Sequence, residues 1–166
     1  MADIMTIPEQ TPTTMALVPA TDAAGRTSSY FSCKNAAKVY AVFYITQGNA
    51  ATVACDVLQA SAVAGTGAKA IAGTCRLWST ADVATASTAM PSRVATDAAA
   101  FTTSAAVANK VVIVEIDSAV NLDIAGGFDC IALRTGASNV ANLTAAAITF
   151  VAPRFAQRNF PTPRLD

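Results

Sequence analysis

Two segments of the chain follow the two-residue period of a β-strand. Residues 38–46 are dense in β-branched and aromatic side chains, which favour strands. One face of this segment carries Val39, Ala41, Phe43 and Ile45. The other face carries Tyr40, Val42, Tyr44 and Thr46. Residues 110–117 are the strongest β-branched run, and their predicted inward face carries Val112, Val114 and Ile116.

Further strands follow from shorter signals. Gln47-Gly48-Asn49 is typical of a turn, so residues 51–58 are predicted to return as the second strand of a hairpin with 38–46. Four more segments have strand character, of which the first is a strand pair or one bent strand: 70–79, 101–104, 129–134 and 145–151. Residues 81–99, rich in Ala, Thr and Ser, are compatible with a loop or with a short helix.

The fold predicted from this pattern is mainly β, in spite of an alanine content that favours helix. Seven or eight short strands separated by turns must cover each other's apolar faces, which indicates an antiparallel β-sandwich, with the jelly roll as one form of it. A core rich in alanine buries little apolar area per residue and so stabilises the domain only modestly. Oligomerisation would bury further apolar area and add to this stability.

The chain divides into three parts: an extended N-terminal arm at 1–29, the sandwich at 30–152, and an extended C-terminal arm at 153–166. Each arm holds three prolines and isolated apolar side chains. The first arm is acidic and the second basic, so they can be steered toward each other or toward charged neighbours. The arms either anchor on a neighbouring protein or fold back on their own domain. The candidate contacts are Ile4, Ile7, Met15, Leu17, Arg154, Phe155, Arg158, Phe160 and Arg164.

Composition and charge exclude several functional classes. The chain has no histidine, which removes the commonest general base and transition-metal ligand. Its 11 basic and 11 acidic residues argue against a nucleic-acid partner. No apolar run approaches the roughly 18–20 residues that span a bilayer, and the N-terminus lacks signal-peptide features, so we expect no membrane partner and a cytosolic site of synthesis.

Four weaker signals bear on chemistry. The four cysteines, Cys33, Cys55, Cys75 and Cys130, form no metal-binding pair and are expected to be reduced, buried thiols. Residues 65–69 resemble a fragment of a phosphate loop but are expected to form a β-turn. A cation site at Asp117, Asp123 and Asp129 is less favoured than solvated carboxylates. A sugar platform of Trp78, Tyr40 and Tyr44 is less favoured than packing. We therefore expect that the protein is not an enzyme and that it binds no cofactor and no metal ion.

Residues 35–156 resemble small head-associated structural proteins of tailed bacteriophages. The resemblance is carried by residues 40–59, which contain Ile45-Thr46-Gln47-Gly48-Asn49-Ala50-Ala51-Thr52-Val53, and by residues 64–70, 114–117, 125–131 and 152–156. It implies a non-enzymatic capsid decoration or cement protein that is made in the host cytoplasm and lies on the capsid surface of the virion. Its implied partners are the major capsid protein and further copies of itself, as a dimer or trimer.

Two other functions stay open at this point. The first is another virion part, namely a head–tail connector or a tail component. The second is a carbohydrate-binding β-sandwich used for host attachment. Copy number in the particle separates decoration from a connector, and binding to glycans would support the attachment function.

Overall fold

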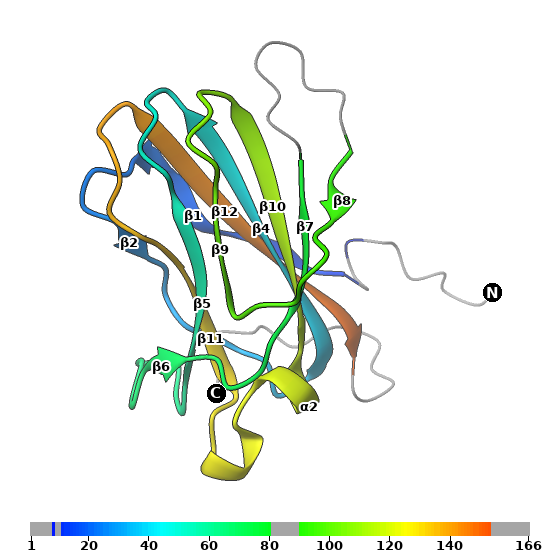
Figure 1. Cartoon of the computed structure of the whole chain (residues 1–166). Coiled ribbons are helices and arrows are strands. Elements are labelled where there is room, and N and C mark those ends of the chain that lie inside the picture. The colour runs from blue at the N-terminus through cyan, green and yellow to red at the C-terminus, as the bar shows by residue number, and fades with distance from the viewer. Residues whose placement is uncertain (1–7, 9–10, 81–89, 154–166) are drawn as a thin grey trace, which may run out of the picture.

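The strand-period segments form the two sheets of an antiparallel β-sandwich in the computed structural model, which describes Pro8 and residues 11–80 and 90–153 (Figure 1). The first sheet has the strand order β1 (Thr13–Thr21), β12 (Asn142–Pro153), β4 (Ala36–Gln47), β10 (Asn109–Asp117), β7 (Arg76–Ser79) and β8 (Ser92–Arg93). The second sheet contains β2 (Arg26–Thr27), β3 (Phe31–Ser32), β11 (Cys130–Thr135), β5 (Ala54–Ala60), β6 (Lys69–Ala70) and β9 (Ala100–Thr102). Two short helical turns, α2 (Ser118–Asn121) and η1 (Ile124–Gly126), follow β10.

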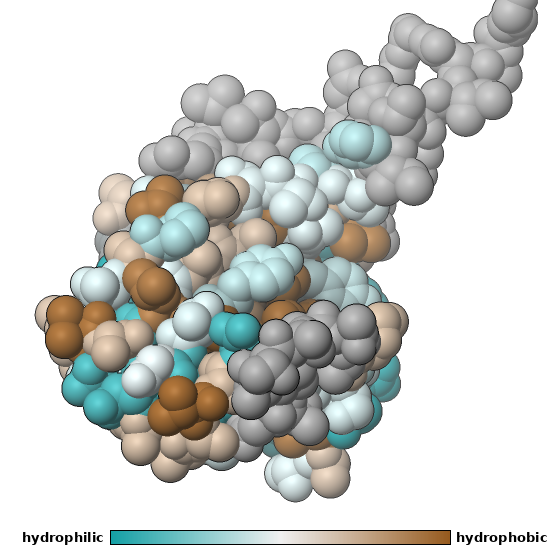
Figure 2. Space-filling view, turned by 90° about the horizontal axis from the view of Figure 1, so that it is seen from above, coloured by the Kyte–Doolittle hydropathy of each residue, from teal (hydrophilic) through white to brown (hydrophobic). Residues whose placement is uncertain are grey.

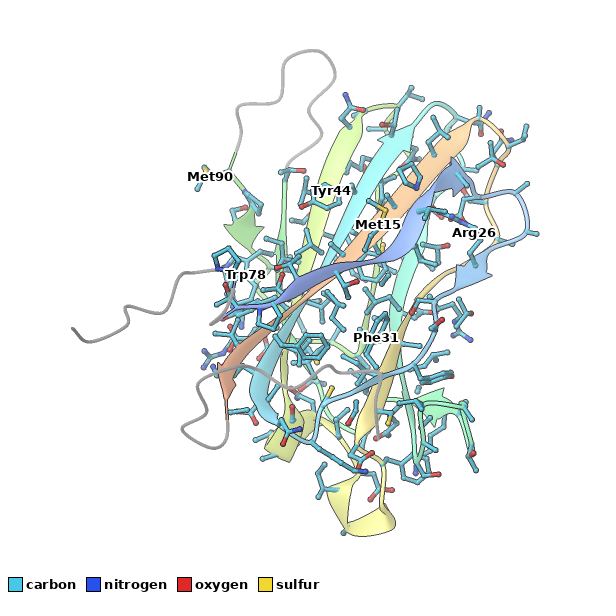
Figure 3. The ribbon with its side chains drawn as sticks, turned by 180° about the vertical axis from the view of Figure 1, so that it is seen from behind. Met15, Arg26, Phe31, Tyr44, Trp78 and Met90 are labelled. Carbon is cyan, nitrogen blue, oxygen red and sulfur yellow. The ribbon has the colours of Figure 1, made fainter. Side chains whose placement is uncertain are left out.

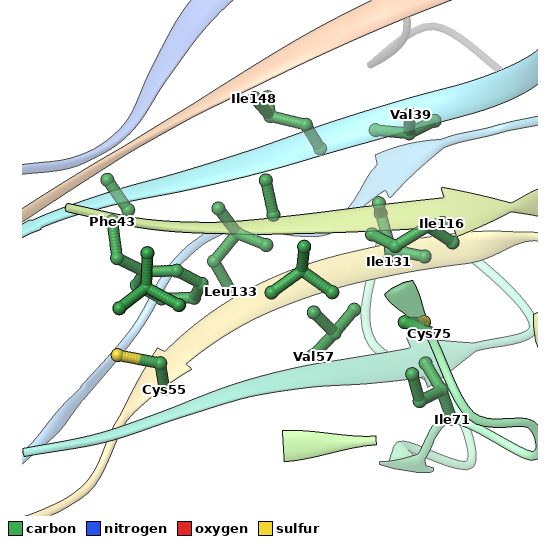
Figure 4. Packing of buried hydrophobic residues seen from close by; sticks show 14 of the residues in the cluster. Val39, Phe43, Cys55, Val57, Ile71, Cys75, Ile116, Ile131, Leu133 and Ile148 are labelled. Atoms are coloured by element: carbon green, nitrogen blue, oxygen red, sulfur yellow. The ribbon is translucent and has the colours of Figure 1, made fainter. Parts of the chain in front are cut away.

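The predicted mainly-β sandwich is therefore confirmed, while the jelly-roll form stays a prediction. Its core lies between the sheets, and the inward face of β4 that the sequence predicts is buried, with Val39, Ala41 and Phe43 at 0% exposure. Figure 4 shows Phe43 of β4 beside Leu133 of the second sheet, and both belong to one buried cluster with Val57. The predicted inward face of β10 is buried as well.

The predicted hairpin between residues 38–46 and 51–58 is wrong. Both strands exist, but β4 belongs to the first sheet and β5 to the second, where β5 pairs with β11. The reason is that both edges of β4 are already occupied: β10 pairs with it from Asn109 to Asp117, and β12 from Asn142 to Pro153. The connection after Gln47 therefore crosses between the sheets instead of reversing within one.

The N-terminal boundary of the sandwich also differs from the expected one at residue 29. Residues 13–21 form β1, an edge strand paired with β12, and residues 26–27 form β2 in the second sheet. Leu17 is buried in the core, and Arg26 donates from Nη1 to the carbonyl oxygen of Val18 over 2.7 Å. Pro19 lies within β1 and is compatible with this pairing, because one row of backbone amides in an edge strand has no partner strand to bond.

The remaining strand predictions hold in part. β11 and β12 match 129–134 and 145–151, and β9 overlaps 101–104. The segment at 70–79 contributes β6 and β7, which lie in opposite sheets. Residues 65–68 form the expected turn, with Gly65 and Gly67 at positive φ, and Lys69 begins β6. Of the stretch 81–99, residues 81–89 lie outside the described part, and β8 follows at Ser92–Arg93.

A buried polar network closes the end of the sandwich where β4 and β10 meet the crossing loops. The Lys110 ammonium group, on a residue that is 4% exposed, donates to Gln47 Oε1 over 2.9 Å and to the Ala106 carbonyl oxygen over 2.7 Å. Gln47 Oε1 also accepts from Thr103 Oγ1 over 2.9 Å. These bonds compensate the cost of burying the lysine and fix the loop before β10.

We expect Phe43→Ala to lower the free energy of unfolding by about 3–5 kcal/mol, because it removes a fully buried ring and leaves a cavity between the sheets. Urea denaturation followed by the fluorescence of Trp78, the single tryptophan, measures the change. Thr46→Ala, on the exposed face of the same strand, is the control and should change it by less than about 1 kcal/mol. Equal losses in the two variants would contradict the assignment of the faces.

Candidate functional site

The outward face of the first sheet carries a continuous row of uncharged side chains. Backbone pairing places five residues at one level across neighbouring strands, in the order Met15, Ala147, Val42, Ile113 and Trp78. Met15 is 60% exposed at the β1 edge. Figure 3 views the molecule from this side, with Met15, Tyr44 and Trp78 labelled. Two positions further along each strand, Val111, Tyr44 and Ala145 are paired in the same way. We call these two rows of residues together the apolar half of the outward face.

A hollow of about 490 Å³ lies at this next level. Tyr44 is 51% exposed there and lies between Val111 of β10 and Ala145 of β12 in the sheet register. Leu143 and Pro19 complete its apolar wall. The volume falls in the range of roughly 300–1,000 Å³ that is usual for ligand pockets, and the lining suits an apolar or aromatic group.

The opposite half of the same face is charged. Glu115 Oε1 lies 2.6 Å from Lys38 Nζ and 4.0 Å from Arg76 Nη1, and the Tyr40 hydroxyl is 3.3 Å from Glu115 Oε2. The hydrogen bond and charge of Glu115 raise the pKa of Lys38 above its usual 10.5. Burial, and then the charge of Glu115, raise the pKa of Tyr40 above 10.0. A cleft of about 370 Å³, also lined by Asp97 and Asp117, adjoins this charged half.

Of the partner-contact residues expected from the sequence, the structure describes two. Met15 lies on the outward face and is exposed, so it is available to a partner. Leu17 is 6% exposed and packs in the core, so it is not available, because it sits at a position of β1 that turns inward. The other seven expected contacts lie outside the described residues, namely Ile4, Ile7, Arg154, Phe155, Arg158, Phe160 and Arg164.

The three aspartates considered for a cation site are held by separate partners. Asp117 caps α2 by accepting from the Ala119 amide, and Asp123 caps η1 and pairs with Lys69 over 2.8 Å. Asp129 lies 3.7 Å from Lys34. Within residues 11–80 and 90–153, no three His, Cys, Asp or Glu side chains are grouped to hold a metal ion.

The aromatic residues considered for a sugar platform share one face but have separate neighbours. Tyr40 contacts Glu115, Tyr44 lines the hollow, and the Arg93 guanidinium lies 5.4 Å from the centre of the Trp78 ring. Tyr40 and Trp78 therefore each contact a charged neighbour, whereas Tyr44 lines the hollow.

All four cysteines are buried thiols, as the sequence predicts. Burial raises the pKa of the Cys75 thiol to about 12. Burial also raises the pKa of the Cys55 thiol, assisted by the nearby charges of Asp56 and Asp22. Thiols in this state are poor nucleophiles, because the thiolate is the reactive form.

Comparison of the chain with protein-family models, with curated proteins and with solved structures gives no match. Among the residues that the structure describes, no helix has the length and apolar character needed to cross a membrane.

Sequence reasoning did not single out the residues of the apolar half other than Met15, Tyr44 and Trp78. The signal was present, since residues 38–46 and 110–117 are apolar on both faces in the middle of each run. An antiparallel strand with one solvated face normally alternates apolar with polar residues. Val42, Val111 and Ile113 break that alternation, and only the sheet order places them side by side.

The cysteine environment predicts unreactive thiols in the folded protein. We expect a disulfide reagent such as Ellman's reagent to label Cys55 and Cys75 only after unfolding, because raised pKa values leave little thiolate near pH 8. Absorbance of the released thiolate, with and without guanidinium, measures this. Rapid labelling of the native protein at either residue, located by mass spectrometry, would contradict the buried state.

The charged half predicts a loss of stability in alkali. Lys38 and Tyr40 both have raised pKa values, so their contribution is present below pH 10 and is lost as the pH rises through the folded-state values. Glu115→Gln removes a cause of both shifts and should flatten the fall of Tm above pH 10. Thermal melts across this range test it, with Asp97→Asn as control, and an unchanged slope in Glu115→Gln would contradict the assignment.

Proposed function

We propose that this chain is a non-enzymatic structural protein of a tailed-bacteriophage particle, and specifically a decoration or cement protein that bridges and stabilises major capsid proteins. The sequence resemblance over residues 35–156 motivates this assignment. The observation that supports it best is the apolar half of the outward face, where Val42, Ile113 and Tyr44 lie on a rigid sheet and face away from the core.

The character of this face suits an adhesive rather than a catalytic role. Soluble monomers rarely expose contiguous apolar surface without a partner for it. The inner strands of this face, β12, β4, β10 and β7, are paired on both sides, so binding orders little backbone and loses little conformational entropy. Tyr44 beside a hollow has the form of an aromatic anchor at the centre of a protein interface.

In this proposal the protein adds to the capsid surface after synthesis in the host cytoplasm. Met15 is the described member of the expected partner contacts that remains exposed on the sandwich. The expected contacts at Phe155 and Phe160, which follow the end of β12, remain predictions for the capsid side.

The experiment counts the copies of this protein in the purified virion and determines where in the particle they lie. We expect quantitative mass spectrometry to find on the order of hundreds of copies per virion, because a decoration protein repeats with the symmetric shell. Particle reconstruction should place a β-sandwich of this size on the outside of the shell.

Two results would contradict the decoration role. About six or twelve copies at one vertex would identify a connector or tail component instead. Absence from particles, together with binding of the purified protein to a glycan array, would favour host attachment or another carbohydrate role.

A further inference from the structure

We propose that the outward face of the first sheet is a self-association surface, on which a second copy of this chain packs about a two-fold axis that runs parallel to the strands between β4 and β10. The sheet register carries this inference, because it fixes which side chains such an axis brings together. It goes beyond the capsid assignment and does not depend on it.

The axis keeps each residue at its level and exchanges β4 with β10 and β12 with β7. In the central row, Val42 of one copy then lies over Ile113 of the other, since the two are paired at one level within each sheet. In the same row Ala147 lies over Trp78, so a small side chain meets the largest one. The row is therefore complementary to itself in shape.

One level away, Tyr44 of the second copy lies over Val111, which lines the hollow beside the first copy's own Tyr44. The two-fold axis makes this contact twice, with each tyrosine entering the other copy's hollow. An aromatic anchor in a desolvated pocket is the usual centre of a protein interface.

The charged half is complementary about the same axis. Lys38 of one copy lies over Asp117 of the other, and Tyr40 lies over Glu115, because these pairs share levels in β4 and β10. A two-fold axis along β4 itself would instead set Lys38 opposite Lys38. A two-fold axis that lies in the interface but runs across the strands would place the charged half of one copy over the apolar half of the other. Charged side chains would then be buried without partners, which costs free energy.

The size of the face fits a second copy. The axis maps the four strands β12, β4, β10 and β7 onto one another. At about 4.8 Å between strands and 3.4 Å per residue, these strands make a face of roughly 19 Å by 30 Å, or about 600 Å². Two copies would together bury roughly 1,200 Å², at the lower end of the range of about 1,200–2,000 Å² for specific interfaces. Aligned packing of two sheets face to face is a common arrangement.

The test measures mass in solution by light scattering after size exclusion. We expect wild type at twice the 16.9 kDa of one chain. Val42→Lys and Ile113→Glu each bury an unpaired charge and should weaken the dimer by about 100-fold or more. Val140→Lys, at a 66% exposed valine outside the apolar half, is the matched control and should remain dimeric. Circular dichroism checks that each variant is folded.

The decisive experiment mixes the two disrupting variants, Val42→Lys and Ile113→Glu, in equal amounts. In a mixed pair the axis sets the introduced lysine of one chain over the introduced glutamate of the other, so the two new charges compensate each other. The second contact of that pair is again Ile113 over Val42, as in wild type. The mixture should therefore form a heterodimer although each variant alone is monomeric.

Several outcomes would overturn the proposal. A mixture that stays monomeric overturns the proposed register. A wild type that is monomeric at its highest soluble concentration, or trimeric, overturns the two-fold interface, as does a Val42→Lys variant that remains dimeric.

The capsid assignment can fail separately. If wild type is monomeric and Val42→Lys loses binding to capsids that lack the protein, the face belongs to the capsid contact and the dimer is overturned. A dimer that dissociates in Val42→Lys and is absent from virions would support this inference while removing the proposed function.

Discussion

The pairing of β4 along both of its edges is the constraint on which the rest of this structure depends. β4 is one of the two longest strands of the described chain, and its partners β10 and β12 come from much later in the sequence. With both edges of β4 filled, the segment that directly follows Gln47 cannot pair with β4, and it crosses to the second sheet, where it forms β5. The two-layered form and the buried Lys110 network at the crossing follow from this pairing.

The same three strands determine both faces of the first sheet. Inward, Phe43, Val112 and Ile148 are fully buried against the second sheet. Outward, the face divides into an apolar half around Tyr44 and a charged half around Glu115. Figure 2 shows the end of the molecule seen from above, where hydrophobic side chains are scattered among polar ones outside the grey atoms.

A structural role and a self-association surface make compatible demands on this face. Both need a rigid surface that loses little entropy on binding, and a sheet whose inner strands are fully paired provides one. The zero net charge of the chain removes long-range repulsion between copies. Local charges then set the orientation rather than the strength of association, since Lys38 and Asp117 lie at one level on neighbouring strands.

The longer strands of the middle of the chain, and the inward faces of β4 and β10, follow from the amino-acid sequence alone. The two-residue period at 38–46 and 110–117 identified β4 and β10 and their buried residues, because alternation is a local property of the chain. The apolar surroundings of the cysteines likewise indicated their burial. Local pattern does not determine which strands are neighbours, so it predicted a hairpin that does not form and assigned β1 to an arm. Val42, Ile113 and Trp78 are far apart in sequence and become one surface only in the sheet, because long-range pairing depends on how both edges of β4 are filled.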